Sequence, residues 1–416
     1  MAAAHTVEEI RAEVDAWLDE NWSEELTVRE WWSRLAGARY AMPGLDEPWG
    51  RGYDRAQARA VTDALRARRA MGPPGGIGTS LSLPTILHHG TPAQIERFVP
   101  RILDGSEGWC QLFSEPNAGS DLAGLQTRAE RDGDEWVVNG QKVWTSTGQH
   151  ADHGILIART DPDLPKHEGI SYFLFPMRQP GVDVRPLVEM TGHAVFNEVF
   201  LDDARVANEN LLGGLNRGWA VANTTLTHER AGIGDTGGGF GRANPGTVAG
   251  HLDRPVSDFT ASRPAIGQGT VTPRTVGRIR ELAAERGCLD DPVVRQGLAA
   301  LHTRVELIGM NAQRWKVSPS RTGVEGNVAK ILMAETVEAA RELLGHICGA
   351  HAQLTGASDE LTSGWLGEFF LFSPAPSIYG GTDQVQRNII GERGLGLPKE
   401  PGPARETPFR ELLANR

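Results

Sequence analysis

This sequence of 416 residues has few cysteines, no excess of basic charge and no long apolar run, and each of these absences argues against a class of protein. The three cysteines, Cys110, Cys288 and Cys348, lie far apart without a CxxC spacing, which argues against a disulfide framework or a zinc site. His88 and His89 lack partners at a metal-ligand spacing, so no metal is expected. A net charge of −11 argues against nucleic acid as the main partner.

The N-terminus, MAAAHTVEEIRAEVDAWLDENW, has neither the basic start nor the apolar run of a secretory signal. No stretch approaches the roughly 20 apolar residues that a membrane span requires. We therefore expect a cytoplasmic protein that does not bind membranes. The chain is long enough for two or three compact units.

The pattern of apolar residues predicts helices, then strands, then helices, which is an α+β organisation. Thr6 and Glu9 stand in capping-box register before a helix over 6–20, and Thr91, Pro92 and Gln94 begin another over 91–105. A helix-rich half returns from about residue 217, with a buried stripe at helical spacing and a further helix over 325–348. The stripe consists of Val294, Leu298, Leu301, Val305 and Ile308.

The middle of the chain reads as strands. An Asn139-Gly140 pair between two β-rich runs predicts a hairpin over 136–144. Further strands are expected at 154–159, 170–177, 182–188 and 196–206, with no helix between them. This arrangement favours an antiparallel sheet or small barrel over a parallel sheet. A stretch rich in Gly and Pro, roughly 234–273, interrupts the last part and is expected to be a long loop or a disordered insertion that no helix could occupy.

Two segments carry residues suited to binding a flat ligand. The first, QLFSEPNAGSD (111–121), offers small residues for close backbone approach and hydroxyls for polar ring edges, and Trp144 could stack on a ring. The second is IYGGTDQVQRN (378–388). On composition alone, a surface loop before a hairpin is an equally good interpretation of the first segment.

Together these segments resemble the acyl-CoA dehydrogenase family. The resemblance lies in SEPNAGSD (114–121), VVNGQKVWTST (137–147) and IYGGTDQVQRNIIGERG (378–394), which occur in the family's order and spacing. It implies an N-terminal helical domain (1–106), a middle antiparallel β-barrel domain (107–214) and a C-terminal four-helix bundle (215–416). It also implies an FAD-dependent oxidoreductase of lipid metabolism that desaturates an acyl-CoA thioester.

The resemblance also implies which residues bind the ligands. Ser120, Arg230, Tyr379 and Gly380 are expected to contact the acyl-CoA. The expected FAD contacts are Gln111, Leu112, Phe113, Ser114, Gly119, Ser120, Trp144, Thr145, Ser146, Arg286, Gln296, His346, Gly349, Thr382 and Gln384.

Among these FAD contacts, Arg286 and Gln296 would reach the FAD of a second subunit. The family's Arg-x-x-Phe-Gly pattern has become Arg286-Gly287-Cys288-Leu289-Asp290, and His346 replaces a usual Gln. A homodimer or homotetramer, possibly a heterotetramer, is implied, with electron-transfer flavoprotein as the electron acceptor.

The catalytic base departs from the common family pattern. Most members carry a Glu in a Tyr-Glu-Gly-Thr setting, where this chain has Gly380. A branch that resembles isovaleryl-CoA dehydrogenase and actinobacterial enzymes acting on steroid side chains places its Glu in a Glu-Arg pair on a helix. Glu229, followed by Arg230, matches that place and is the predicted base. In a closed acyl pocket, desolvation would raise the pKa of this carboxylate towards neutrality, which suits proton abstraction.

Other interpretations stay open at this stage. The glycines at 75–78 and 237–241 lack the strand, helix and acidic residue of a dinucleotide-binding motif, so a Rossmann dehydrogenase is disfavoured. A flavin monooxygenase or oxidase on the same scaffold is an alternative chemistry. The chain could also be one subunit of a hetero-oligomeric acyl-CoA dehydrogenase, in which Glu229 would make it the active member.

Overall fold

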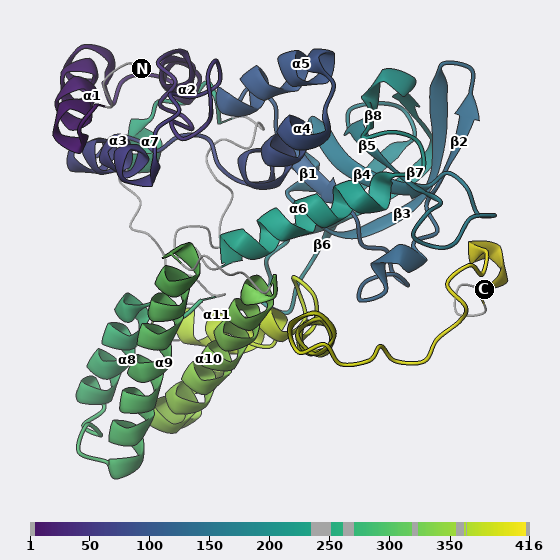
Figure 1. Ribbon diagram of the computed structural model, residues 1–416. Helices are drawn as coiled ribbons and strands as arrows, with labels where there is room; N and C mark the ends of the chain where they lie inside the picture. Colours follow the sequence, from purple (N-terminus) through teal and green to yellow (C-terminus); the bar gives the residue numbers. More distant parts are fainter. Residues whose placement is uncertain are drawn as a thin grey trace.

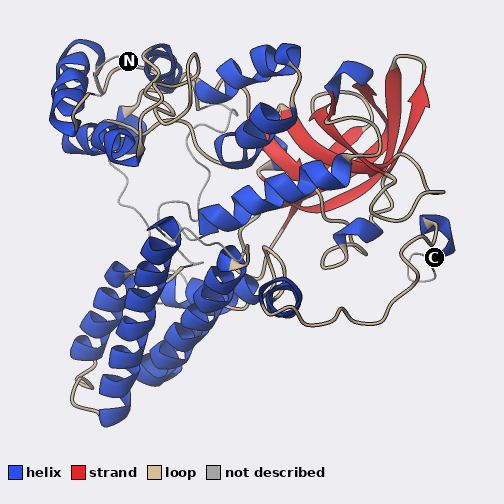
Figure 2. Ribbon diagram, viewed as in Figure 1, coloured by secondary structure: helices blue, strands red, loops and turns tan. Residues whose placement is uncertain are grey.

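The structure is a computed structural model that describes residues 5–233, 251–260, 270–317, 323–354, 362 and 364–412. Figure 1 shows a helical lobe at the N-terminus, a twisted sheet beside it, and a bundle of long helices below both. Figure 2 separates the red strands of the middle part from the blue helices on either side. The predicted order of helices, strands and helices is confirmed.

The N-terminal lobe begins as its caps predict. The Thr6 side chain accepts a hydrogen bond from the Glu9 N–H, and the Glu9 carboxylate accepts one from the Thr6 N–H. Thr91 and Gln94 form the same reciprocal pair. A single core of tryptophans and aliphatic residues joins the first three helices. The helices are α1 (Val7–Asn21), α2 (Val28–Gly37), α3 (Arg55–Ala67), α4 (Leu83–His89) and α5 (Pro92–Leu103).

The middle part is one eight-stranded sheet in the order β6-β7-β3-β2-β4-β5-β8, with β1 paired to β4. All pairings are antiparallel except β1 with β4 and β2 with β4. The strands are β1 (Trp109–Leu112), β2 (Arg128–Asp132), β3 (Glu135–Ser146), β4 (His153–Arg159), β5 (Ile170–Pro176), β6 (Val182–Leu187), β7 (Phe196–Ala207) and β8 (Leu211–Leu212). The four strands predicted between 154 and 206 are confirmed.

The sheet does not close, so the predicted barrel is wrong. No pairing joins β6 to β8 among the described strands. At the β8 edge of the sheet, a helix provides hydrogen-bond donors instead of a strand. Gln94 Nε2 of α5 donates to the carbonyl oxygens of Glu209 (2.8 Å) and Leu211 (3.0 Å). A side chain therefore supplies the donor that a further strand would have given.

The predicted hairpin is also displaced. Asn139 and Gly140 lie inside β3 at a shift in its register with β7, and the real turn between β2 and β3 contains Gly133, with φ 61°. Gly140 is needed for close approach, since a Cβ there would lie 2.4 Å from Thr127 Oγ1. An Asn-Gly pair thus marks a β-bulge here, where its usual reading is a turn.

The last part contains α6 (Gly218–Ile233), α7 (Ser257–Thr260), α8 (Pro273–Glu285), α9 (Pro292–Val317), α10 (Glu325–Cys348), α11 (Trp365–Phe372) and α12 (Asp383–Ile389). The predicted stripe of α9 is confirmed, because Val294 and Leu301 are buried in a core shared with α8 and α10, and Val305 is buried further along the helix. α6 packs along the sheet, where Thr225 Oγ1 lies 3.0 Å from both Tyr172 Oη and Thr85 Oγ1. None of the described helices combines the length and apolar character needed to cross a bilayer.

The predicted insertion at 234–273 is partly corrected. Residues 234–250 and 261–269 lie outside the described residues, but 251–260 contain α7 and 273 begins α8, so helices do occur there. Leu252 and Val256 are buried in the core of the N-terminal lobe. Their segment pairs with the start of α2, for example through the Val28 N–H to the Arg254 carbonyl (3.0 Å). This piece of the insertion packs against the N-terminal lobe. The packing could not be predicted from the sequence, because the surrounding residues are rich in Gly and Pro.

A largely enclosed histidine at the start of β4 makes stability depend on pH. The His153 side chain is 12% exposed, stacks on Trp109 with ring centroids 5.0 Å apart, and lies with Nδ1 3.4 Å from Glu107 Oε2. Burial lowers the pKa of His153 to about 4, with the charges of Arg97 and Arg101 acting in the same direction. The folded protein thus resists a proton that the unfolded chain accepts near pH 6.5.

We expect His153 to contribute stability above about pH 6.5 that is lost as the pH falls to about 4, on the order of 3 kcal/mol. His153→Phe keeps an aromatic ring against Trp109 but cannot take a proton, so it should lose less stability over this interval than the wild type. Urea unfolding of both proteins from pH 7 to pH 4 measures the difference. Burial raises the pKa of Glu107, which acts in the opposite direction in both proteins. Parallel losses in the two proteins would contradict the assignment.

Candidate active site

Glu229 lies beside the first predicted flavin segment. α6 carries this half-buried carboxylate towards the carboxyl end of β1, where Gln111 Nε2 lies 3.4 Å from Glu229 Oε2. The two residues are 118 positions apart in the sequence. Their contact joins the predicted base to the segment 111–121, which we call the flavin loop. The side chain of its neighbour Arg230, predicted to contact substrate, lies outside the described residues.

A buried ion pair holds the loop that follows β1. Lys142 of β3 is fully buried and donates from Nζ to Glu115 Oε1 (2.8 Å) and to the Phe113 carbonyl (3.0 Å). Glu115 also accepts the backbone N–H groups of Gln126 (2.7 Å) and Thr127 (2.9 Å). Burial pushes the pKa of Glu115 up, but the charge and hydrogen bonds around it outweigh burial and hold that pKa below its usual value.

This pair fixes the start of the segment 114–121 against β3 and against residues 126–127. Sequence reasoning missed it, although Glu115 and Lys142 both stand inside the quoted motifs. The sequence did contain a signal for this ion pair, namely a carboxylate in one motif and a lysine in the next.

The end of β3 presents the predicted flavin contacts. Trp144 has φ 62° and is 58% exposed, an unusual combination for a bulky residue in a strand. Its neighbour Thr145 is fully buried, and Thr145 Oγ1 has no hydrogen-bond partner within the described protein. The Val143 N–H donates to the Ser114 carbonyl (2.9 Å), which places this strand end beside the loop. An exposed aromatic face next to an unsatisfied hydroxyl fits a flat ligand with polar edges.

The second predicted segment forms a tight turn before α12. Gly380 and Gly381 have φ 63° and 83°, a conformation that a side chain would strain. Thr382 caps α12 by accepting from the Val385 N–H (3.3 Å), and Gln384 is exposed on its first turn. Burial raises the pKa of Tyr379 to about 12, so its phenol stays neutral at physiological pH.

Buried polar side chains that sequence reasoning missed hold this turn in place. Gln386 is fully buried and donates from Nε2 to the Gly380 carbonyl (2.6 Å), while Asn327 Nδ2 donates to Gln386 Oε1 (2.5 Å). Lys330, also fully buried, donates to Asp383 Oδ1 (2.7 Å). α10 therefore supports the turn through Asn327 and Lys330.

The remaining predicted FAD contacts lie elsewhere. The end of the bundle where α8 meets α9 lies away from the sheet (Figure 1). Arg286 follows α8, Gln296 lies near the start of α9, and His346 and Gly349 lie at the end of α10; all four are exposed, and His346 Nε2 lies 3.5 Å from Asp291 Oδ2. An exposed position is what a contact to a second subunit requires, and their role stays a prediction.

Leu112 and Phe113 are buried, whereas Gly119 and Ser120 are exposed at the tip of the loop and Ser146 is half-buried.

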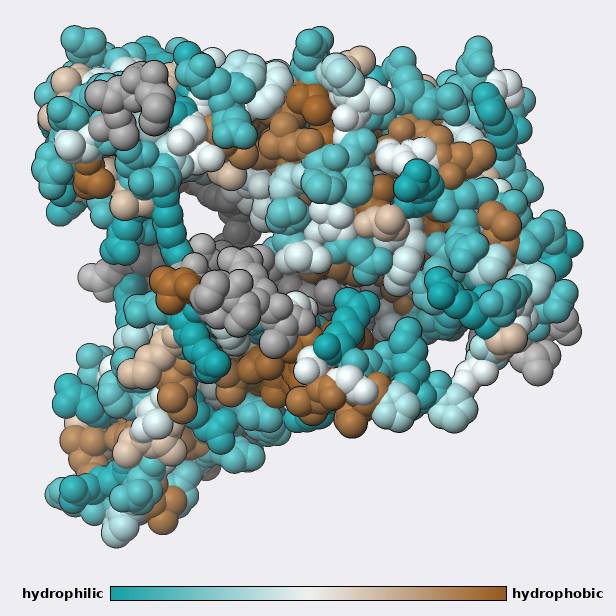
Figure 3. Space-filling model, in the orientation of Figure 1, coloured by the Kyte–Doolittle hydropathy of each residue, from teal (hydrophilic) through white to brown (hydrophobic). Residues whose placement is uncertain are grey.

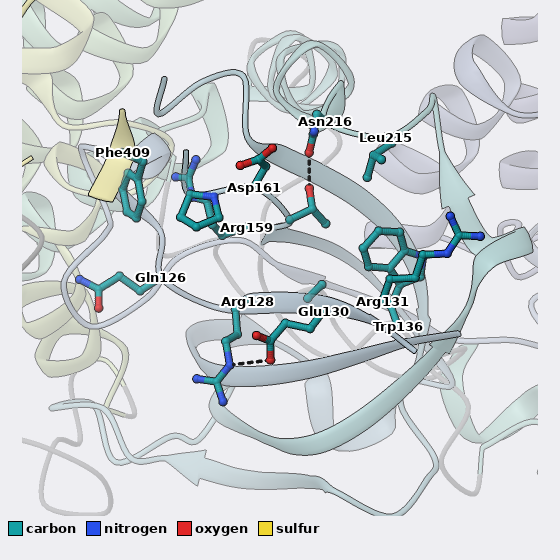
Figure 4. Close-up of a pocket in the computed structure, with 13 residues that line it drawn as sticks. Gln126, Arg128, Glu130, Arg131, Trp136, Arg159, Asp161, Leu215, Asn216 and Phe409 are labelled. Carbon is teal, nitrogen blue, oxygen red and sulfur yellow. Dashed lines mark hydrogen bonds and ion pairs between the residues drawn. The ribbon is translucent and has the colours of Figure 1, made fainter. Parts of the chain in front are cut away.

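A pocket of about 700 Å³ opens elsewhere on the middle part, and none of the predicted site residues lines it. Figure 4 shows its walls, formed by β2, the end of β4, Asn216 and Phe409 from the chain's end.

Comparison with known proteins identifies the fold and its chemistry. The descriptions "Acyl-CoA dehydrogenase, N-terminal domain", "middle domain" and "C-terminal domain" match residues 1–106, 110–204 and 256–395. Acyl-CoA dehydrogenase IpdE1 of Mycobacterium tuberculosis is 37% identical over 95% of this chain and 98% of its own length. Acyl-CoA dehydrogenase FadE34 of the same organism is 36% identical over 88% of this chain and 46% of its own length.

Solved structures agree with these relatives. A variant of the Tcur3481-Tcur3483 steroid acyl-CoA dehydrogenase has a TM-score of 0.71 and 26% identity, covering 95% of this chain and 99% of that one. The ChsE4-ChsE5 complex from Mycobacterium tuberculosis has a TM-score of 0.67 and 28% identity, covering 96% and 100%.

The fold and the site therefore define a flavin-dependent oxidoreductase of the acyl-CoA type. The chain belongs to the acyl-CoA dehydrogenase family, whose members use FAD. The predicted family, cofactor and fold class are confirmed, with the open sheet as the correction.

Proposed function

We propose that this chain removes the α-proton of an acyl-CoA thioester with the Glu229 carboxylate. The observation that supports it is the 3.4 Å approach of Glu229 to Gln111, which places a helix-borne carboxylate beside the flavin loop. Gly380 provides no carboxylate at the alternative position. Its segment is held by Gln386, so the turn keeps a backbone N–H available to a thioester carbonyl oxygen.

The other residues bind and orient. Gln111 fixes the carboxylate through its amide, and Ser120, exposed at the loop tip, contacts the CoA moiety. Trp144 and Thr145 hold the isoalloxazine ring by stacking and by the buried hydroxyl, with Ser114 and Ser146 beside them. FAD, when bound, accepts the hydride from the β-carbon.

We further propose a bulky acyl group and a partner subunit. The structural relatives are a steroid acyl-CoA dehydrogenase and a complex of two chains, and FadE34 is more than twice as long as the matched region. Apolar surface is exposed on the face of the bundle that Figure 3 shows, which suits an interface with a second copy or a homologous chain. The exposed apolar residues of the last part of the chain include Leu307, Met310, Ile378 and Leu395. Electron-transfer flavoprotein is the proposed acceptor, and the cytoplasm the proposed location.

Anaerobic titration with acyl-CoA tests the proposal. We expect a polycyclic acyl-CoA to bleach the flavin and yield the α,β-unsaturated thioester, with a straight eight-carbon acyl-CoA at least tenfold less efficient, since lost apolar contacts of about 1.4 kcal/mol change a rate tenfold. Rapid reoxidation by oxygen with a hydroxylated product would favour a monooxygenase. A chain that purifies without flavin, and gains it only with a second chain, would be one subunit of a hetero-oligomer.

A further inference from the structure

The end of the chain returns to the middle domain. After α12 and the turn over Ile390–Gly394, the chain runs away from the bundle and reaches the β4–β5 connection (Figure 1). There the Phe409 N–H donates to the Leu164 carbonyl (3.0 Å) and the Arg410 N–H to the Pro162 carbonyl (3.1 Å). Between residues 395 and 412, Phe409 is the one described residue that is buried. A single aromatic side chain therefore anchors this tail.

Phe409 covers a buried arginine. The Arg159 guanidinium carbon lies 3.7 Å from the Phe409 ring centroid, and Arg159 is 4% exposed (Figure 4). No carboxylate pairs directly with this guanidinium among the described ion pairs, and Arg159 Nε has no hydrogen-bond partner there. The aromatic face thus supplies negative electrostatic potential to a desolvated cation, which makes this contact stronger than one at an exposed site.

Arg159 connects the two loops beside the proposed CoA contact. Its Nη2 donates to the carbonyls of Ala123 (2.7 Å) and Leu125 (3.4 Å), just after the loop that carries Ser120. Its Nη1 donates to the Lys166 carbonyl (2.7 Å) on the β4–β5 connection. Lys166 Nζ in turn donates to Asp121 Oδ1 (2.7 Å), the residue next to Ser120. Arg159 therefore contacts the residues that follow the Ser120 loop directly, and it holds the β4–β5 connection whose Lys166 side chain binds Asp121.

We infer that Phe409 is a positioning residue for substrate binding, which holds Arg159, and through it the loop of Ser120 and Asp121, in the geometry that receives the CoA moiety. The inference rests on the proposed role of Ser120. Phe409 contacts Arg159 and the β4–β5 connection, and it takes no part in the proton or hydride transfer. Its loss should therefore weaken acyl-CoA binding while leaving proton abstraction at Glu229 unchanged.

The test compares Phe409→Ala with Phe409→Tyr and Phe409→Leu, with Arg410→Ala as the matched control. Arg410 stands next to Phe409 in the tail, and its side chain pairs with Asp163 at the surface. We expect F409A to raise KM for acyl-CoA about tenfold with kcat within about twofold, because a desolvated cation–π contact is lost. F409Y should restore KM, F409L should fall between, and R410A should match the wild type.

A second measurement follows the local stability of the loop in the absence of catalytic turnover. Hydrogen exchange of peptides covering 114–126 and 161–169 should quicken in F409A and stay at the wild-type rate in R410A and F409Y. Unchanged exchange and unchanged KM in F409A would overturn the inference, as would a fall in kcat or flavin content with KM intact. If F409A does not fold, F409L decides by the same two readouts. If no acyl-CoA reduces the wild-type flavin, the proposed function fails, while the exchange result still judges the role of Phe409.

Discussion

Replacing Glu229 with Gln should lower the rate of flavin reduction by acyl-CoA about 10³- to 10⁴-fold, since the variant lacks the carboxylate that takes the α-proton. Gln keeps the size of the side chain and can still hydrogen bond to Gln111, so FAD content and thioester binding should stay close to the wild type. Stopped-flow reduction at saturating acyl-CoA measures the chemical step directly. The expected signature is a fall in kcat with little change in the dissociation constant.

Two further variants control this result. Glu209→Gln removes an exposed carboxylate that pairs only at the surface with Arg97, and it should leave the rate unchanged. Gly380→Glu in the E229Q background moves a carboxylate to the more common family position. Because Gly380 has φ 63°, a side chain there costs roughly 1 kcal/mol or more, so we expect partial rescue at most. An E229Q enzyme within tenfold of the wild type would contradict the role of Glu229.

Removing Lys142 should destabilise the protein by about 3–5 kcal/mol, the largest stability effect we expect from one side chain. Lys142→Met keeps the length of the side chain but leaves the buried Glu115 carboxylate without its partner. The Phe113 carbonyl also loses a donor. Since this pair fixes the flavin loop, K142M should lose FAD at a lower temperature than the wild type, as thermal unfolding followed by flavin fluorescence would show.

A double variant separates the charge from the packing. Glu115→Gln with Lys142→Met removes both charges of this ion pair and should recover part of the lost stability. The amide of Gln can still accept one of the N–H groups of Gln126 and Thr127. If K142M alone were as stable as the wild type, the ion pair would have no structural role.

The sequence predicted the elements whose signals are local. Thr6 with Glu9, and Thr91 with Gln94, fix helix starts through neighbours three residues away, and these starts are where expected. The stripe from Val294 to Val305 needs only one helix face to be recognised. Glu229 and Gln111 were found because both stand in motifs of the family, and the structure brings these two side chains together.

Features that depend on distant partners were missed. Whether the sheet closes depends on which group hydrogen bonds to the free edge of β8. The group that does so is the Gln94 side chain of the N-terminal lobe, which donates to the Leu211 carbonyl. Asn139-Gly140 reads as a turn until Thr127 is known to lie against Gly140. Likewise, residues 251–260 look like part of a loop because their apolar partners belong to α2, more than 200 positions earlier. The buried polar supports Lys142, Lys330 and Gln386 read as surface residues by type alone.

The proposed mechanism depends on Glu229 being the group that removes the proton, and solvent exchange at the α-carbon tests this most directly. A 3-thia-acyl-CoA has an acidified α-carbon and cannot release a β-hydride, so only the proton step can occur. We expect the wild-type holoenzyme to exchange its α-protons for deuterium in D₂O, as followed by NMR, and E229Q to do so at least 10³-fold more slowly at equal occupancy. Exchange by E229Q at the wild-type rate would show that another group is the base.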